Sequence, residues 1–564
     1  MKIVNLFLNC KPKTVIMKKS LIALVAISMM LTVQAQRTTG KLKDQKDVWG
    51  TTYTYSGEIK NGKPDGFGVA AYNNGYTLRY VGEFVNGVMS GKGTMFYEKG
   101  VFLTGDWKNG KMNGNGANVN KEGTFYMGGM KDGVRSGKGW LVLKSNGFYL
   151  GEFKNDTYDG MGIYGWGDGR TLGQNIYKDG KRNGPGFQYE AKTEQLFQGT
   201  WDDDKWQSAS TAPFKSFMQG AGFKSDTSTK QILIASLDAN NYAKDTAFFY
   251  LKEKNKRFFG VFNEGYLTSG MQWVDDKSRL IGNFDKDGAQ GYCYNFKFND
   301  LYAEGNYTND YMNGDHCLFL DFVDTSVYIG SMKNGKYTGK AIFVNKNNTI
   351  YDGDYLEGKF TGTGRVIYSS GRSIKGTFKD GAAVKLTSIS TADGKSINPN
   401  PASFSEALNN VVSAYENLYD DVVGEYVDEA DLGSIYACYL HFPGDDNPYS
   451  TTDFYDTDLY QTTLAKDKDE SSAEKLYKDY AQKILATSIT GVTTNKLELN
   501  GTVESHTSGA DETMSVFTLN VNNNSAYDYM KVWLIMKKNA DDNNYSVIIV
   551  VGGMEDDSAS PYYM

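Results

Sequence analysis

The chain has 564 residues, with 63 glycines, 40 tyrosines and 30 phenylalanines but only 9 prolines. Its formal net charge is −7, and residues 396–564 hold 9 lysines against 28 acidic residues. This balance argues against a nucleic-acid partner.

The first 35 residues are predicted to be a secretory signal peptide. Lysines precede an apolar run from Leu21 to Leu31, and Ala35 ends a small-residue cleavage site. Because the run is too short to cross a bilayer, an uncleaved anchor is the weaker alternative. We expect translation to start at Met17, cleavage after Ala35, and a periplasmic or extracellular location. The segment removes five lysines and no acid, so residues 36–395 carry +7 and residues 396–564 carry −19.

A glycine recurs about every 23 residues after a polar lead-in at 36–50. A fixed period of this size indicates a repeat architecture in which each unit is one supersecondary element. Residues 51–206 are predicted to form a first array and residues 257–385 a second. The leading glycines are Gly57, Gly82, Gly105, Gly128, Gly151 and Gly199, with Asn175 at the missing place, and then Gly260, Gly282, Gly305, Gly330, Gly353 and Gly376.

Each unit has the composition of a β-hairpin. Apolar residues alternate around the leading glycine, as in Tyr80-Val81-Gly82-Glu83-Phe84, which is typical of a half-buried strand. The pair Asn86-Gly87 then supplies the positive φ that a tight turn needs. A Gly-x-Gly motif, Gly91 and Gly93, begins the return strand. The repeats therefore predict a long antiparallel sheet of consecutive hairpins.

These units resemble the MORN repeat (membrane occupation and recognition nexus). The shared pattern is Tyr-x-Gly-x-Phe/Trp-x-x-Gly-x-x-x-Gly-x-Gly, and it covers about residues 55–206 and, more loosely, 258–381. Asn175, Asp156, Asp204 and Asp310 depart from it. The resemblance implies a β-hairpin array used for protein–protein association, scaffolding or oligomerisation, and lipid binding has also been proposed for the family.

The remaining segments separate or follow the arrays. Residues 207–256 interrupt the repeat and are expected to cap and join the two arrays, whereas residues 386–402 resemble a linker. Residues 403–564 predict an acidic α+β domain that resembles no family known to us. It should contain a helix from Ser403 to about Tyr419, a second capped by Ser471 or Ser472, and strands at 514–521, 529–536 and 545–551.

The aromatic residues on either side of the leading glycines should share one face of the sheet and stack into a ladder. This ladder is interpreted either as the core of a one-layer sheet or as an exposed groove that binds a sugar, a peptide or a helix. As a binding face, the ladder would consist of Tyr80, Phe84, Trp107, Tyr149, Phe153, Tyr328, Tyr351 and Tyr355.

The sequence offers little for catalysis or metal binding. Cys293 and Cys317 lie one period apart and could form a disulfide or remain two buried thiols. Cys438 and His441 could pair as thiol and imidazole, but a zinc site needs four ligands. Aspartates between 445 and 458 lack the spacing of a calcium loop. No catalytic residue, metal or cofactor is therefore assigned.

We expect an exported, non-catalytic scaffold of the bacterial cell envelope that binds protein partners, with a homodimer plausible because array ends leave open strand edges. Two alternatives stay open. One is a module that binds envelope glycan or anionic lipid through the ladder and the +7 charge of the arrays. The other is an enzyme with its site in residues 403–564.

Overall fold

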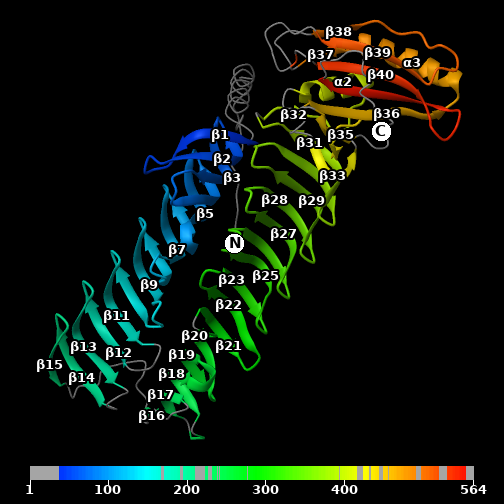
Figure 1. Ribbon diagram of the computed structural model, residues 1–564. Helices are drawn as coiled ribbons and strands as arrows, with labels where there is room; N and C mark the ends of the chain where they lie inside the picture. Colours follow the sequence, from blue (N-terminus) through cyan, green and yellow to red (C-terminus); the bar gives the residue numbers. More distant parts are fainter. Residues whose placement is uncertain are drawn as a thin grey trace, which may run out of the picture.

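Within the residues that it describes, the computed structural model contains three antiparallel sheets and two α-helices (Figure 1). It describes residues 37–166, 171–190, 195–209, 223–226, 231–237, 239–240, 242–275, 277–392, 394–415, 423–430, 433–443, 449–454, 457–490, 497–519, 527 and 530–553. The predicted signal peptide lies outside these residues. The predicted fold class, an antiparallel sheet of hairpin repeats followed by an α+β domain, is confirmed.

The first sheet has 15 strands whose spatial order follows the chain. They are β1 (Thr38–Lys46), β2 (Thr52–Lys60), β3 (Lys63–Tyr72), β4 (Thr77–Val85), β5 (Val88–Tyr97), β6 (Phe102–Lys108), β7 (Lys111–Val119), β8 (Phe125–Lys131), β9 (Val134–Val142), β10 (Phe148–Lys154), β11 (Thr157–Gly165), β12 (Thr171–Lys178), β13 (Lys181–Glu190), β14 (Gln195–Asp202) and β15 (Lys205–Ala209), with the 3-10 turn η1 (Glu98–Gly100).

The second sheet has 17 strands, also in chain order. They are β16 (Phe223–Asp226), β17 (Gln231–Leu237), β18 (Ala243–Leu251), β19 (Lys256–Asn263), β20 (Tyr266–Trp273), β21 (Ser278–Asp285), β22 (Gly288–Lys297), β23 (Leu301–Thr308), β24 (Tyr311–Met312), β25 (Gly314–Asp321), β26 (Val327–Lys333), β27 (Lys336–Val344), β28 (Ile350–Leu356), β29 (Lys359–Ile367), β30 (Ser373–Lys379), β31 (Ala382–Ser390) and β32 (Ser396–Ile397), with the 3-10 turn η2 (Lys252–Lys254).

The two sheets run side by side, so the chain folds back on itself (Figure 1). Thr39 in β1 hydrogen-bonds Ser373 in β30, with 2.7 Å between the hydroxyl oxygens. At the other end of this contact, the ring centroid of Phe148 lies 4.5 Å from that of Phe259. The first repeats of one array therefore pack against the last repeats of the other, around a shared apolar cluster.

Consecutive hairpins are also joined at their turns. The amide of Gly110 donates to the carbonyl of Met89 at 3.0 Å, and Gly133 donates to Met112 at 2.9 Å. The same bond recurs in the second sheet, from Gly335 to Met312 and from Gly381 to Phe360. Because the donor is the residue after the positive-φ turn residue, the repeated turn motif also fixes the stacking of neighbouring repeats.

The third sheet has nine strands, with α2 (Phe404–Ala414) and α3 (Glu470–Leu485) packed against it. In spatial order its strands are β33 (Val423–Ala430), β34 (Gly433–Cys438), β35 (Tyr449–Phe454), β36 (Thr457–Lys468), β41 (Tyr545–Gly553), β40 (Met530–Lys538), β39 (Glu512–Leu519), β38 (Leu497–Gly501) and β37 (Ser488–Ile489).

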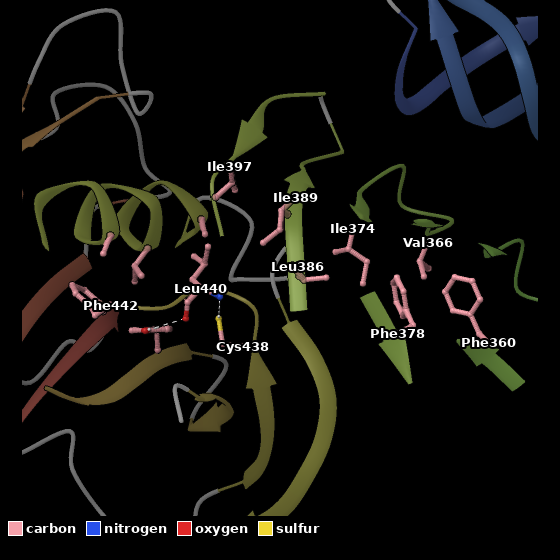
Figure 2. Close-up of a cluster of buried hydrophobic side chains, with 14 of the residues drawn as sticks. Phe360, Val366, Ile374, Phe378, Leu386, Ile389, Ile397, Cys438, Leu440 and Phe442 are labelled. Carbon is pink, nitrogen blue, oxygen red and sulfur yellow. Dashed lines mark hydrogen bonds between the residues drawn. The ribbon is translucent and has the colours of Figure 1, made fainter. Parts of the chain in front are cut away.

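One hydrophobic cluster joins the second array to this domain (Figure 2). Phe378, Leu386 and Ile389 continue the core of the array, and Leu440 and Phe442 belong to the same cluster on the domain side. The array and the domain therefore form one packed body.

The structure differs from several expected boundaries. The lead-in forms β1, because residues 38–46 pair with β2. The segment 207–256 supplies β16 to β18, so it begins the second sheet. The supposed linker contains the end of β31 and β32, and its Asn400 side chain donates to the carbonyl of Leu386 at 2.8 Å.

The helix caps are confirmed in part. Ser403 caps α2 by accepting from the amide of Glu406 at 3.2 Å. The cap of α3 is Asp469, which accepts from the amide of Ser472 at 3.0 Å. Asp and Ser are equally good caps, so sequence alone did not separate them. The predicted end of the first helix, after residue 415, lies outside the described residues.

Candidate functional site

A row of glycines crosses the first sheet from strand to strand. Gly82 pairs with Gly93 within one hairpin, and Gly93 pairs with Gly105 of the next. We call this line of paired positions the glycine row. It runs through Gly57, Gly68, Gly82, Gly93, Gly105, Gly116, Gly128, Gly139, Gly151 and Gly162.

The ladder tyrosines lie across this row. The Tyr80 hydroxyl reaches over Gly82 and Gly93 and donates to the carbonyl of Glu83 at 3.3 Å. Tyr149 does the same towards Glu152 at 3.1 Å. Burial raises the pKa of Tyr80 well above its usual value, so the phenol remains protonated and keeps this donor.

The ladder rings meet edge to face, both within one repeat and between successive repeats. The Tyr80 ring lies 5.2 Å from both Phe84 and Trp107, and Tyr149 lies 5.1 Å from Phe153. The Trp107 indole also donates to the carbonyl of Gly93 at 2.9 Å. Each contact is typical of aromatic packing in a core.

The structure places the predicted binding ladder in the interior. Tyr80, Phe84, Trp107, Tyr149, Phe153, Tyr328 and Tyr355 are each at most 6% exposed, and Tyr351 is half-buried. The seven buried rings leave no surface on which a sugar or peptide could stack. The interpretation of the ladder as core therefore fits the geometry.

The two cysteines of the second array lie on the corresponding row of paired positions in the second sheet. Cys293 pairs with Gly305, and Cys317 lies on the other side of Gly305 and pairs with Gly330. Strand β23 therefore separates them by two strand spacings, roughly 9.5 Å. A disulfide needs Cα atoms within about 7 Å, so the suggested bond is wrong and both thiols are free and buried.

Among the described residues of the C-terminal domain, the two histidines lie in different surroundings. Cys438 is buried in the shared core, whereas His441 is exposed. The His506 side chain is buried, and its ring nitrogens bond Thr513 at 2.7 Å and Glu470 at 3.0 Å. These contacts hold the loop before β39 against the start of α3.

Two further observations concern ligands and membranes. Within the described residues, no group of three or more metal-ligating side chains comes together, and part of the acidic stretch at 445–458 lies outside them. Among the same residues, no helix has the length and apolar character needed to cross a membrane.

Several exposed large hydrophobic side chains of the second sheet lie beside or near its hairpin turns. We define the tip row as five residues that are 53–60% exposed and lie beside or near the stacked turns. They are Tyr242, Tyr266, Tyr311, Leu356 and Val384. Tyrosine is enriched in protein interfaces. Sequence periodicity had drawn attention to the buried ladder instead.

Comparison with known proteins identifies the repeats. Seven segments match the family model described as MORN repeat, at residues 55–75, 80–101, 104–116, 126–148, 149–169, 328–350 and 351–371. Strands β12 to β15 and β16 to β25 lie outside the matched segments and pair in the same antiparallel order. No match is found among curated proteins.

Among solved structures, the chain resembles PorZ, described as an essential bacterial surface component of the type-IX secretion system of Porphyromonas gingivalis. The sequence identity is 9%, the TM-score is 0.10, and the alignment covers 91% of this chain and 86% of that one. Likeness at this level carries no argument about fold or function.

Proposed function

Because this chain is a MORN-repeat protein, we propose that it is an exported, non-catalytic scaffold of the bacterial cell envelope that docks a protein partner on the tip row. The observation that carries this proposal is the division between buried and exposed aromatic residues. The ladder side chains pack in the core, whereas the tip row exposes tyrosine and aliphatic side chains to solvent.

The construction of the molecule supports a platform role. The two arrays share one cluster along their contact, and the second array shares another with the C-terminal domain. Rigid elements hold a binding surface in a fixed shape, which lowers the entropy lost on association. Export rests on the signal-like segment ending at Ala35 and is part of the proposal.

The test is affinity capture from envelope extract with the chain from residue 36 to 564. The decisive variant combines Tyr266→Ser, Tyr311→Ser and Leu356→Ser. A matched control changes Tyr76, Leu78 and Val85 to Ser, which are exposed residues of the first sheet. We expect one partner at fixed stoichiometry, lost in the tip-row variant and kept in the control. Retention by both variants, or no partner for the wild type, contradicts the proposal.

Export is tested separately. Mass spectrometry of the protein from envelope or medium should find a mature N-terminus at Gln36. An intact N-terminal segment on protein in the cytoplasm would contradict export while leaving the docking test unaffected.

A further inference from the structure

We call the contact between the two arrays the seam. The side chains that fill it differ along its length. Near Gly57, the Arg365 guanidinium bridges Glu58 at 3.1 Å and Asp352 at 2.9 Å. Further along, Glu304 lies half-buried and accepts a hydrogen bond from Tyr302 at 2.6 Å. At both levels, polar side chains of the second sheet fill the space facing the first.

At the level of Gly151 and Gly260, no described residue of the second sheet places a long polar side chain in this space. The second sheet contributes Val261 and Ser269 there, and the glycine rows of both sheets expose backbone in place of side chains. A cavity of about 460 Å³ remains between β9–β12 and β19–β20. Its volume lies within the range of small-molecule sites.

The walls of this cavity are mostly apolar. They are formed chiefly by Trp140, Leu150, Met161, Ile163, Phe259 and Val261. Met161 and Val261 are 45% and 46% exposed, so they mark the mouth, whereas Ile163 and Phe259 are buried. The only charged groups lining the cavity, among the described residues, are Lys138 and Glu152, which are cross-strand partners of opposite sign.

One buried polar group in the cavity wall lacks a partner. Gln174 is 1% exposed, and its Nε2 donates to the Met161 sulfur at 2.9 Å. Its Oε1 has no hydrogen-bond partner within the described residues. Because a thioether can only accept, the sulfur fixes the nitrogen end and leaves the oxygen as a free acceptor. A buried acceptor without a donor is costly. Because this oxygen has almost no accessible surface, a ligand donor would remove that cost by bonding it after the carboxamide turns towards the cavity.

We propose that this cavity binds a neutral, largely apolar small molecule that carries one N–H or O–H donor. The apolar part lies between Trp140, Leu150 and Phe259, and the donor bonds Gln174 Oε1. A net charge on the ligand is disfavoured because Lys138 and Glu152 balance each other at the cavity. This site is separate from the tip row and does not depend on the proposed scaffold function.

The probe for the test is N-phenyl-1-naphthylamine, which is neutral, apolar and has one N–H; its fluorescence rises in apolar surroundings. The comparison compound is 1-phenylnaphthalene, which has similar rings and no donor. On the full chain from residue 36, we expect one saturable site, and displacement should show about tenfold weaker binding of 1-phenylnaphthalene. Equal affinity of the two compounds overturns the role of Gln174.

Variants locate the site. Gln174→Leu should abolish the difference between the two compounds, and Val261→Trp should reduce probe binding at least tenfold by filling the mouth. Val323→Trp is the matched control, an exposed valine beside β25 of the same sheet that does not line the cavity, and should bind like wild type. Binding by Val261→Trp equal to that of wild type, or no saturable binding by wild type, overturns the proposal.

Discussion

The hydroxyl of Tyr80 occupies the space that a side chain at position 93 would need. A Cβ placed on Gly93 would lie 2.1 Å from the Tyr80 oxygen and 2.4 Å from its ring carbon Cζ. A Cβ placed on Gly162 would likewise collide with the Tyr149 hydroxyl. The Gly-x-Gly motif is therefore half of a packing unit whose other half is the tyrosine thirteen residues earlier.

Gly93→Ala should destabilise the first array by about 1–3 kcal/mol, because the Tyr80 ring must move out of a filled core. Position 93 is not in the positive-φ region, so backbone strain adds nothing. The shift in the urea midpoint of the first-array unfolding transition measures the effect. An unchanged midpoint would contradict the packing unit.

The second array suggests a compensating pair. There Ala303 stands at the tyrosine position, and Cys317 replaces the glycine. The double variant Tyr80→Ala, Gly93→Cys should therefore lose less stability than the two single variants together, by at least about 1 kcal/mol of coupling. If the stability loss of the double variant equals the sum of the losses of the two single variants, the two positions do not share space.

The sequence predicted the hairpin and its turn because their signals are local. Asn86-Gly87 sets the turn type, and alternation around Gly82 sets the strand, so both were confirmed. The ladder was correctly placed on one face, but its burial was left open. That outcome depends on how the tyrosine folds back over the glycine pair, which spacing does not reveal.

Arg365 should contribute to holding the arrays together. Its side chain is 27% exposed and that of Glu58 17%, so removing the cation leaves a poorly solvated carboxylate. Arg365→Met is expected to cost about 1–3 kcal/mol, between the values for buried and surface pairs. The matched control is Lys336→Met, which breaks the exposed pair with Glu357 and should cost within about 0.5 kcal/mol. Equal effects in thermal unfolding would contradict the seam role.

Cys293 and Cys317 should remain reduced even in an oxidising medium. Burial raises the pKa of both thiols, so they react slowly as well as being too far apart. Iodoacetamide should label neither in the native chain and both after denaturation, as read by mass spectrometry. A peptide linked through these two cysteines would contradict the strand order around β23.

The cap of α3 should depend on pH. Hydrogen bonds from Ser472 and Ser471 lower the pKa of Asp469 to about 2, from an ordinary value of 3.8. Since the folded pKa is depressed, the ionised cap contributes stability above about pH 4 and loses it as pH falls towards 2. Hydrogen-exchange protection of the first turn of α3 should fall over that interval in the wild type.

Asp469→Asn tests the same point, because asparagine caps a helix without titrating. Its protection should be nearly constant over this interval, whereas Asp469→Ala should be poorly protected throughout. A wild-type profile parallel to that of Asp469→Asn would rule out titration of the cap.

The parts that sequence did not predict are long-range. The pairing of Thr39 with Ser373 joins residues more than 300 positions apart, and the repeats give no sign of which unit faces which. The cavity beside Gln174 also depends on how the two arrays face each other, because residues of both sheets line it, Val261 among them. Local patterns determine a hairpin, but the register between arrays depends on packing of whole faces.

The central claim is that the chain folds back so that its first strands pack on its last repeats. The most direct measurement is cross-linking of the double variant Thr39→Cys, Ser373→Cys, whose hydroxyl oxygens lie 2.7 Å apart in the wild type. Mass spectrometry after mild oxidation should show a near-complete disulfide between these positions. The control variant Thr39→Cys, Ser278→Cys should form no disulfide between these positions. Absence of the first link, or equal formation of both, would contradict the folded-back arrangement.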